Sequence, residues 1–597
     1  MKKGCFWGFV MVVGLWLPVL AQQPLDWARG IVWYQIFPER FYNGLAGNDP
    51  TTAEVPEAEL EPGWQVHPWT SDWYKLQPWE RKRSQNFYEV VFTRRYGGDL
   101  VGVIQKLPYL KKLGVDAIYF NPIFEAPSLH KYDGSSFHHV DDNFGPNPQR
   151  DKARLAAANE TEDPATWIWT SADSTFLELI RKAHQLGMKI VIDGVFNHTG
   201  RKFFAFQDIL KHGPNSRYRD WYGILRWDNP ETPQDEFDYK AWWGFKSLPE
   251  FAEDSSGLKA GPKAYIFNIT RRWMDPDGDG DPSDGVDGWR LDVAEEVAAP
   301  FWREWYRLVK SINPQAITVA EIWHDASEWI RDRRMDATMN YLFARATVKF
   351  LINHKQRISG VAFGKELASI ARRYGDAAHI LWNLIDSHDT DRLASMIVNP
   401  DRDYDRQAGP RDNPNYDVRK PNEHERAIQR QVVVLQMTYI GAPMIYYGDE
   451  AGMWGADDPD DRKPMVWPEL QFEPERHHPL PGHTRPVDSN GFDYQMFRFY
   501  QQMIALRHQL PALQRGSFSL ISEACTETTV AFKRVLDSQE VVVILNASDE
   551  VATVSIPAKA LTARQFREVF TNRLLSKNML RTLRIAPRHF QIFVSFN

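Results

Sequence analysis

The segment GWRLDVAEE, residues 288–296, places an arginine and a carboxylate at the end of a short apolar run. A run of this length bounded by polar residues predicts a buried strand. Asp292 lies two positions after Arg290, whose positive charge would keep a neighbouring carboxylate ionised. The segment therefore predicts a strand that presents an ionised carboxylate at its carboxyl end.

Two further segments follow the same plan, TVAEIWH at residues 318–324 and LIDSHDTDR at residues 384–392. Glu321 lies between apolar residues and Trp323, surroundings that favour the protonated acid. One ionised and one protonated carboxyl group are the equipment for cleaving a glycosidic bond. A single acidic residue beside an apolar run is more simply a strand-end or helix-capping residue, so the inference depends on the set of segments.

Short apolar runs rich in β-branched and aromatic residues predict eight strands in series, at residues 31–37, 117–121, 189–196, 288–293, 317–322, 337–343, 379–385 and 443–447. Helical patterns lie between most of them and are clearest at residues 176–186 and 301–312. Strands that alternate with helices indicate an α/β protein with a parallel sheet. Eight such units predict a TIM barrel, whose active site lies where the strands end.

Three long connections interrupt this pattern, at residues 41–98, 125–172 and 198–263. Long loops on the catalytic face usually carry specificity. The acidic run at residues 457–461 predicts a solvated loop. After a helix predicted at residues 497–510, alternating strands are predicted at residues 529–535, 540–545 and 584–596, which indicates a C-terminal β-sandwich.

Two more segments, DGVFNH at residues 193–198 and GAPMIYYGDE at residues 441–450, raise the set to five. In order and rough spacing the five resemble the motifs of the α-amylase superfamily, glycoside hydrolase family 13, and especially its cyclomaltodextrinase and neopullulanase branch. The resemblance implies a (β/α)8 TIM barrel with a domain B insertion after the third strand and a C-terminal antiparallel β-sandwich. It implies a catalytic domain at residues 22–514, with domain B at 199–263, and the sandwich at 515–597.

The same resemblance assigns the catalytic roles. Asp292 matches the nucleophile, Glu321 the general acid and then base, and Asp389 the carboxylate that stabilises the transition state. A retaining mechanism needs two carboxyl groups about 5 to 5.5 Å apart, one of which forms a covalent glycosyl intermediate. The implied reaction is hydrolysis of α-1,4-glucosidic bonds with retention.

Further residues match substrate-binding positions of the family: His198, Arg290, His388, Phe137, Trp323 and Arg392. Phe137, in the stretch NPIFEAPSLHKYDGSSF, stands where the family has a tyrosine that stacks on the reacting sugar. Arg290 would hold Asp292, or simply form an ordinary salt bridge, and Trp323 would line the leaving-group side or be a core aromatic.

Three departures from the family pattern leave the substrate preference open. Glu250 and Phe251 replace the usual polar residues after Leu248 and Pro249, and Glu295 replaces a common asparagine.

Two metal sites are predicted. The family's calcium site matches Asn43, Asn48, Asp49, Gly97 and Asp99, although Leu45 replaces one expected aspartate. Oxygen ligands of this number suit Ca²⁺. A second candidate, Asp275, Asp277 and Asp279, resembles the start of an EF-hand loop, but position twelve is Val286, and a solvated acidic turn is the alternative.

Residues 1–21 predict a cleaved export signal, with Lys2 and Lys3 before an apolar run that Pro18 interrupts. The alternative, a membrane anchor, would need about 20 apolar residues. A periplasmic or secreted protein is expected. Removal of the signal leaves Cys525 as the one cysteine, so no internal disulfide is expected.

The composition limits the partners. The formal net charge of −7 argues against nucleic-acid binding, and 23 Trp, 22 Tyr and 34 Phe supply aromatic faces on which sugars stack. The first strand is predicted about ten residues after the signal, so the N-terminal sandwich that helps related enzymes to dimerise is not expected. A monomer, or a dimer of another kind, is predicted.

The expected substrates are cyclomaltodextrins, pullulan and maltooligosaccharides from starch. Two alternatives stay open: an endo-acting α-amylase, which only its products would distinguish, and a catalytically inactive glucan-binding protein on the same fold.

Overall fold

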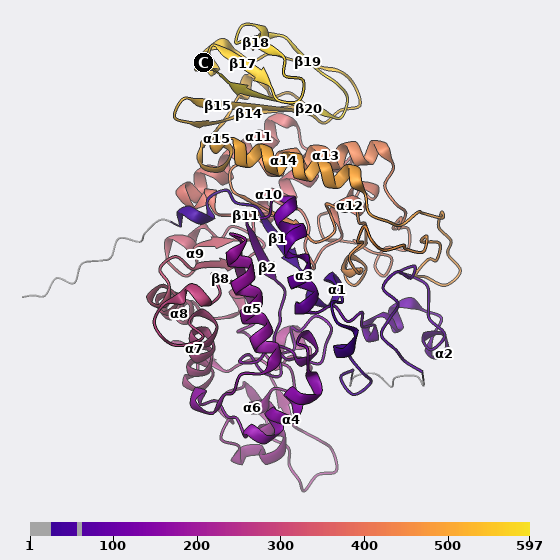
Figure 1. Cartoon of the computed structure of the whole chain (residues 1–597), viewed down its shortest axis with the longest axis vertical. Coiled ribbons are helices and arrows are strands. Elements are labelled where there is room, and N and C mark those ends of the chain that lie inside the picture. Colours follow the sequence, from indigo (N-terminus) through magenta and orange to yellow (C-terminus); the bar gives the residue numbers. More distant parts are fainter. Residues whose placement is uncertain (1–24, 56–62, 597) are drawn as a thin grey trace, which may run out of the picture.

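The computed structural model describes residues 25–55 and 63–596 (Figure 1). The predicted export signal lies outside these residues. Among the described helices, none is long and apolar enough to span a bilayer.

The centre of the molecule is a barrel of eight parallel strands. Its strands are β1 Trp33–Ile36, β2 Ala117–Phe120, β3 Lys189–Gly194, β8 Gly288–Leu291, β9 Ile317–Ala320, β10 Ala337–Thr338, β11 Trp382–Asn383 and β12 Ala442–Tyr446. The sheet order is β10-β9-β8-β3-β2-β1-β12-β11, and a parallel bridge between Met339 and Trp382 joins its two ends. The strands are buried on both faces, which explains their almost continuous apolar runs.

All eight predicted strands are present. Most are a few residues shorter than predicted, and the two at 337–343 and 379–385 are only two residues long. The run at 337–343 ends as a strand at Thr338, because the Asn340 side chain accepts a hydrogen bond from the Phe343 N–H and starts helix α10 Tyr341–Thr347. In the run at 379–385 the first residue belongs to a 3-10 helix, Gly375–His379, and only Trp382–Asn383 pair as a strand.

Helices cover the barrel (Figure 1). They include α3 Leu100–Leu113, α5 Ser171–Gln185, α7 Ala260–Met274, α8 Ala299–Ile312, α11 Gly360–Tyr374, α13 Glu423–Thr438 and α14 Tyr494–Gln509. The predicted helices 176–186, 301–312 and 497–510 are confirmed as α5, α8 and α14. Helix α5 begins earlier than predicted because Thr170 and Asp173 form a reciprocal capping box.

The long connection after β3 contains helix α6 Phe204–His212 and two small hairpins, β4 Ile224–Arg226 with β5 Asp238–Tyr239 and β6 Glu253–Asp254 with β7 Gly257–Leu258. We call residues 199–263 the insertion. An antiparallel bridge from Glu250 to His198 returns it to the end of the third barrel strand.

The C-terminal part is antiparallel. A six-stranded sheet has the order β13 Ser517–Leu520, β14 Thr529–Leu536, β15 Gln539–Asn546, β20 His589–Ser595, β17 Gln565–Glu568 and β18 Leu574–Ser576, and β16 Ala552–Val554 pairs with β19 Leu583–Ile585. The predicted strand 584–596 is therefore two strands, β19 and β20, in different sheets.

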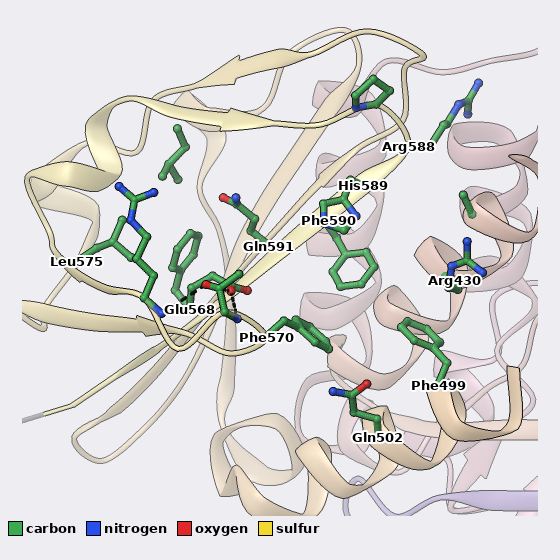
Figure 2. Close-up of a pocket in the computed structure, with 16 residues that line it drawn as sticks. Arg430, Phe499, Gln502, Glu568, Phe570, Leu575, Arg588, His589, Phe590 and Gln591 are labelled. Carbon is green, nitrogen blue, oxygen red and sulfur yellow. Dashed lines mark hydrogen bonds between the residues drawn. The ribbon is translucent and has the colours of Figure 1, made fainter. Parts of the chain in front are cut away.

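This C-terminal part lies over the α13 and α14 side of the barrel (Figure 1). Phe590 of β20 contacts Phe499 of α14 and Phe570, with ring centroids 6.1 and 5.5 Å apart. A cavity of about 600 Å³ lies beside these rings. Figure 2 shows the three phenylalanines converging between the helix and the sheet, so this aromatic cluster joins the two parts.

The prediction of a solvated loop at residues 457–461 is wrong. Asp460 is fully buried, and its carboxylate accepts hydrogen bonds from Trp73 Nε1 at 2.8 Å, Tyr74 Oη at 2.9 Å and Tyr88 Oη at 2.7 Å. All three donors belong to the connection after β1. A charge run can be buried where a distant loop supplies the hydrogen bonds, which sequence spacing does not reveal.

Candidate active site

Arg290 lies at the centre of a buried charge cluster at the carboxyl ends of β3, β8 and β9. Its Nη1 is 2.9 Å from both carboxylate oxygens of Asp193 and 3.0 Å from Asp292 Oδ1, and its Nη2 is 3.0 Å from Glu321 Oε2. The guanidinium is fully buried. One side chain thus holds Asp292 and Glu321 next to each other, because the planar guanidinium offers donors on two sides.

The backbone between the two carboxylates is strained. Val293 has φ 37° and ψ 48°, a left-handed conformation that is rare for a β-branched residue. Its N–H donates to Glu321 Oε2 at 2.9 Å. This turn lets the residue after Asp292 contact the neighbouring strand's carboxylate, and strain of this kind concentrates at functional sites.

The surroundings of Glu321 are polar, which differs from the prediction. Arg290 forms an ion pair with Glu321, the Val293 N–H donates to its Oε2, and Trp323 Nε1 donates to its Oε1 at 2.9 Å. The Trp323 ring stacks on Tyr341 with centroids 3.9 Å apart. Trp323 is half-buried, and its indole N–H contacts the predicted acid directly. It therefore lies in the candidate site and not in the core.

His388 and Asp389 reach the same site from the loop after β11. His388 Nε2 is 2.6 Å from Tyr132 Oη and 3.1 Å from Asp389 Oδ1, and its Nδ1 is 2.9 Å from Gln35 Nε2. Tyr132 Oη also donates to Asp193 Oδ2 at 2.9 Å. Asp193, Arg290 and His388 are thereby linked into one network.

Arg462 provides a second positive charge beside Asp389. Its Nη2 is 3.6 Å from Asp389 Oδ1, and its Nε and Nη2 donate to the His388 carbonyl at 2.9 and 2.6 Å. Arg462 directly follows the acidic run at residues 457–461, so the loop that contains this run also brings a positive charge to the site.

Burial changes the protonation of these groups. It raises the pKa of Asp292 well above its ordinary value, and Arg290 opposes this rise. Arg290 thus acts on Asp292 in the predicted direction, but burial acts in the opposite direction and has the larger effect on its pKa. Burial, followed by the negative charge of Glu321, raises the pKa of Asp389 to about 7. Burial also lowers the pKa of His388 well below its usual range, which favours the neutral ring.

His198 lies where the insertion leaves β3. It is buried, and burial lowers its pKa to about 4. Its Nε2 has no hydrogen-bond partner among the described residues. Its ring stacks on Trp242 of the insertion, with centroids 5.6 Å apart and planes 27° apart. A neutral imidazole with an unused nitrogen can bind a sugar hydroxyl.

Two of the predicted substrate-binding residues, Phe137 and Arg392, are buried and do not join the charge cluster. Phe137 is 1% exposed and packs on Phe124 and Phe203 in the core. The tyrosine that contacts the site is Tyr132, five residues earlier in the same stretch. Arg392 is fully buried and donates to the carbonyls of Asp461 and Tyr447, so it joins two loops instead of facing a substrate.

Sequence reasoning also missed residues that complete the site: Gln35, Asn121, Tyr132, Asp193 and Arg462. Asp193 is the first residue of the quoted DGVFNH segment, so this motif could have predicted it as a site residue. Asn121 and Tyr132 lie in the quoted stretch NPIFEAPSLHKYDGSSF, and Asn121 Nδ2 donates to Tyr132 Oη at 3.0 Å. Gln35 and Arg462 lie outside the quoted segments and meet the site only through the closure of the barrel.

The five residues of the first metal candidate lie together beside β1. Asn43 Nδ2 donates to Asp49 Oδ1 at 2.6 Å, and burial raises the pKa of Asp49 to about 6. Asn48 Oδ1 is buried and unpartnered within the described chain. Gly97 has φ 74°, and a Cβ there would lie 2.2 Å from Asp49 Oδ1. An orphaned oxygen and a cradle without a side chain fit a hard cation.

Asp99 has another explanation. Its carboxylate accepts hydrogen bonds from the N–H groups of Leu45 at 3.0 Å and Gly102 at 2.5 Å, so it caps helix α3.

The second metal candidate differs from its prediction. Asp275 and Asp277 cluster with Asp284, while Asp279 accepts a hydrogen bond from the Asp281 N–H. The structure thus replaces Asp279 by Asp284 in the cluster.

Comparison with known proteins identifies relatives of this chain. The family model for the alpha amylase catalytic domain matches residues 35–161 and 171–516. Neopullulanase 2 of Thermoactinomyces vulgaris is 37% identical over 530 residues, which cover 89% of this chain and 71% of that protein. A cyclomaltodextrinase of Thermoanaerobacter pseudethanolicus is 31% identical, covering 91% and 75%. The solved type III pullulan hydrolase from Thermococcus kodakarensis is 25% identical with a TM-score of 0.69, covering 96% and 83%.

Proposed function

This chain belongs to the alpha-amylase family, glycoside hydrolase family 13, and is an α-glucan hydrolase; from this premise we propose that it cleaves α-1,4-glucosidic bonds with retention. The proposed substrates are cyclomaltodextrins, pullulan and maltooligosaccharides from starch. Relatives named neopullulanase, cyclomaltodextrinase and maltogenic alpha-amylase support this range.

One observation carries the mechanism: a single buried guanidinium, Arg290, contacts both Asp292 and Glu321. A retaining mechanism requires two carboxyl groups about 5 to 5.5 Å apart, and a shared arginine holds its two partners close. Inverting enzymes keep the carboxyl groups farther apart to admit a water between them and the sugar.

In the proposed first step Asp292 attacks the anomeric carbon, and the bond to the leaving oxygen breaks as Glu321 transfers its proton to that oxygen. A covalent glycosyl ester on Asp292 results. In the second step Glu321 takes a proton from water, whose oxygen displaces Asp292 from the anomeric carbon. The proton is thereby returned to Glu321, and the anomeric configuration is retained.

The surrounding residues position these groups and the sugar. Trp323 Nε1 orients the Glu321 carboxyl group. Asp389, His388 and His198 are proposed to bind hydroxyl groups of the reacting ring, and Tyr132 offers an aromatic face beside His388, on which its ring is stacked at 7° between planes.

Ca²⁺ is proposed as a structural ion held by Asn43, Asn48, Asp49 and the Gly97 backbone, with Asp99 beside it. No step of the reaction passes through this site. Export to the periplasm or beyond the cell is proposed from residues 1–21, and a monomer, or a dimer that does not use an N-terminal sandwich, is proposed for the assembly.

Product analysis tests the function. The protein would be incubated with β-cyclodextrin, pullulan and soluble starch in the presence of calcium, and the anomer of the first product would be followed by NMR. Fast opening of cyclodextrin, panose from pullulan and an α-anomer are expected. Starch cleavage alone would favour an endo-acting α-amylase instead. Absence of cleavage in every substrate would favour a glucan-binding protein.

A further inference from the structure

Trp243, in the insertion, is the most exposed large apolar side chain of the described residues, with 77% of its surface accessible. Phe245, two positions on, is 56% exposed. Single exposed apolar residues are common on protein surfaces and need no explanation. Trp243 differs because its position is built by the surrounding backbone.

The backbone around Trp243 is held by hydrogen bonds on both sides. Gly244 N–H donates to the Ala241 carbonyl at 2.9 Å, and Trp242 N–H donates to the Leu248 carbonyl at 3.0 Å. Trp243 itself has φ 47° and ψ 24°. Large side chains rarely adopt this left-handed conformation, and here it projects the indole outward from a closed turn.

The indole continues a stack that begins in the candidate active site. His198 stacks on Trp242, and Trp242 stacks on Trp243 with centroids 5.0 Å apart and planes 14° apart. Trp242 covers one face of the Trp243 ring, so the exposed surface is mainly the other face. Trp242 Nε1 is buried and lacks a partner in the described part of the chain.

A flat indole face open to water suits the apolar C–H face of a pyranose ring, because the contact removes apolar surface from water on both sides. We propose that Trp243 is an aromatic platform that binds a glucose ring of a long or cyclic α-glucan outside the catalytic site. This inference rests on the proposed function and adds a residue that determines chain-length preference.

The test compares Trp243→Ala and Trp243→Phe with the control Leu225→Ala. Leu225 is 60% exposed on β4 of the same insertion and has no part in the stack. The measured quantities are kcat and KM for β-cyclodextrin, maltoheptaose and maltotriose. For the two larger substrates Trp243→Ala is expected to lower kcat/KM about 3- to 10-fold, mainly through KM, the scale of one aromatic stacking contact. Maltotriose turnover should stay within twofold, and Trp243→Phe should recover part of the loss.

Three results would overturn the platform. If Trp243→Ala leaves KM unchanged for both larger glucans, Trp243 does not bind them. If kcat/KM for maltotriose falls equally, the role of Trp243 is structural. If light scattering shows that Trp243→Ala changes the oligomeric state, Trp243 is a contact between copies of the chain.

Binding separates this inference from the proposed function. Calorimetric titration of β-cyclodextrin into the Glu321→Gln variant, with and without Trp243→Ala, measures the platform without turnover. If the double variant binds β-cyclodextrin more weakly and the wild type is inactive, Trp243 binds the glucan but the proposed hydrolysis is refuted. Hydrolysis with binding independent of Trp243 would do the reverse, and no binding at all would refute both.

Discussion

Replacing Arg290 by lysine tests the central feature of the site. The guanidinium contacts Asp193 and Asp292 through Nη1 and Glu321 through Nη2. A lysine keeps the positive charge, but its single ammonium group cannot reach partners on both sides. At least one buried, charge-assisted hydrogen bond is therefore lost, which is worth about 1.5 to 3 kcal/mol.

The expected result is a decrease of this size in the free energy of unfolding and a decrease of kcat/KM by about 10- to 100-fold, since about 1.4 kcal/mol corresponds to a factor of ten. Urea unfolding followed by circular dichroism and initial rates on β-cyclodextrin measure the two quantities.

Arg303→Lys is the matched control. Arg303 pairs with Asp332 at 2.6 Å, but the two side chains are 38% and 32% exposed. Exposed pairs of this kind contribute little to stability because water screens them, so this variant should resemble the wild type in both assays. If Arg290→Lys also unfolds and turns over like the wild type, the shared guanidinium does not hold the two carboxylates, and the reasoning fails.

Four further outcomes are expected. Glu321→Gln should lower kcat by at least about 100-fold, the scale of general acid catalysis, and full activity in this variant would remove the catalytic assignment. The pKa of Asp389 is raised to about 7, so its contribution to stability is present below about pH 4 and is lost as the pH rises through about 7. Urea unfolding at pH 5 and pH 8 should therefore show that Asp389→Asn gains stability relative to the wild type at pH 8. The same difference in free energy of unfolding at both pH values would contradict the raised pKa. Chelation by EDTA should lower the melting temperature of the wild type but not of Asp49→Ala, and identical responses of the two proteins would argue against the calcium site. Tyr132→Phe removes the hydroxyl between His388 and Asp193 and should lower kcat/KM about tenfold, the cost of a hydrogen bond to a charged group, with an unchanged rate as the contrary result.

The fold was largely predictable because barrel strands carry a local signal. Each strand is buried on both faces, so its apolar run is visible without its neighbours. The two strands that fall furthest short of their predicted length, at 337–343 and 379–385, show the limit of this signal. An apolar run continues into the Tyr341–Thr347 helix, and only the Asn340 cap marks where the strand ends.

The site was predictable where its residues lie in the quoted motif segments. Asp292 and Glu321 follow β8 and β9 directly, and the structure brings them together through Arg290. Phe137 was predicted to bind the sugar, whereas Tyr132 contacts the site residues. Both are aromatic residues of one long loop, and neither spacing nor composition indicates which of them faces the active site. The buried acidic run fails as a prediction for the same reason, since its hydrogen-bond donors are almost 400 residues away in sequence.

By itself, the sequence determined the strand series, the order of the carboxylates and the presence of a long insertion after the third strand, because hydrophobic periodicity and motif order are local properties of a chain. The tertiary structure alone decided which polar residues share the site. Closure of the barrel brings Gln35 and Arg290 from distant strands, and His388 from the loop after β11, into one buried network. In that low-dielectric interior, burial shifts the pKa values of titratable side chains because it destabilises their charged forms. Only residues that are neighbours in space can stabilise those charged forms.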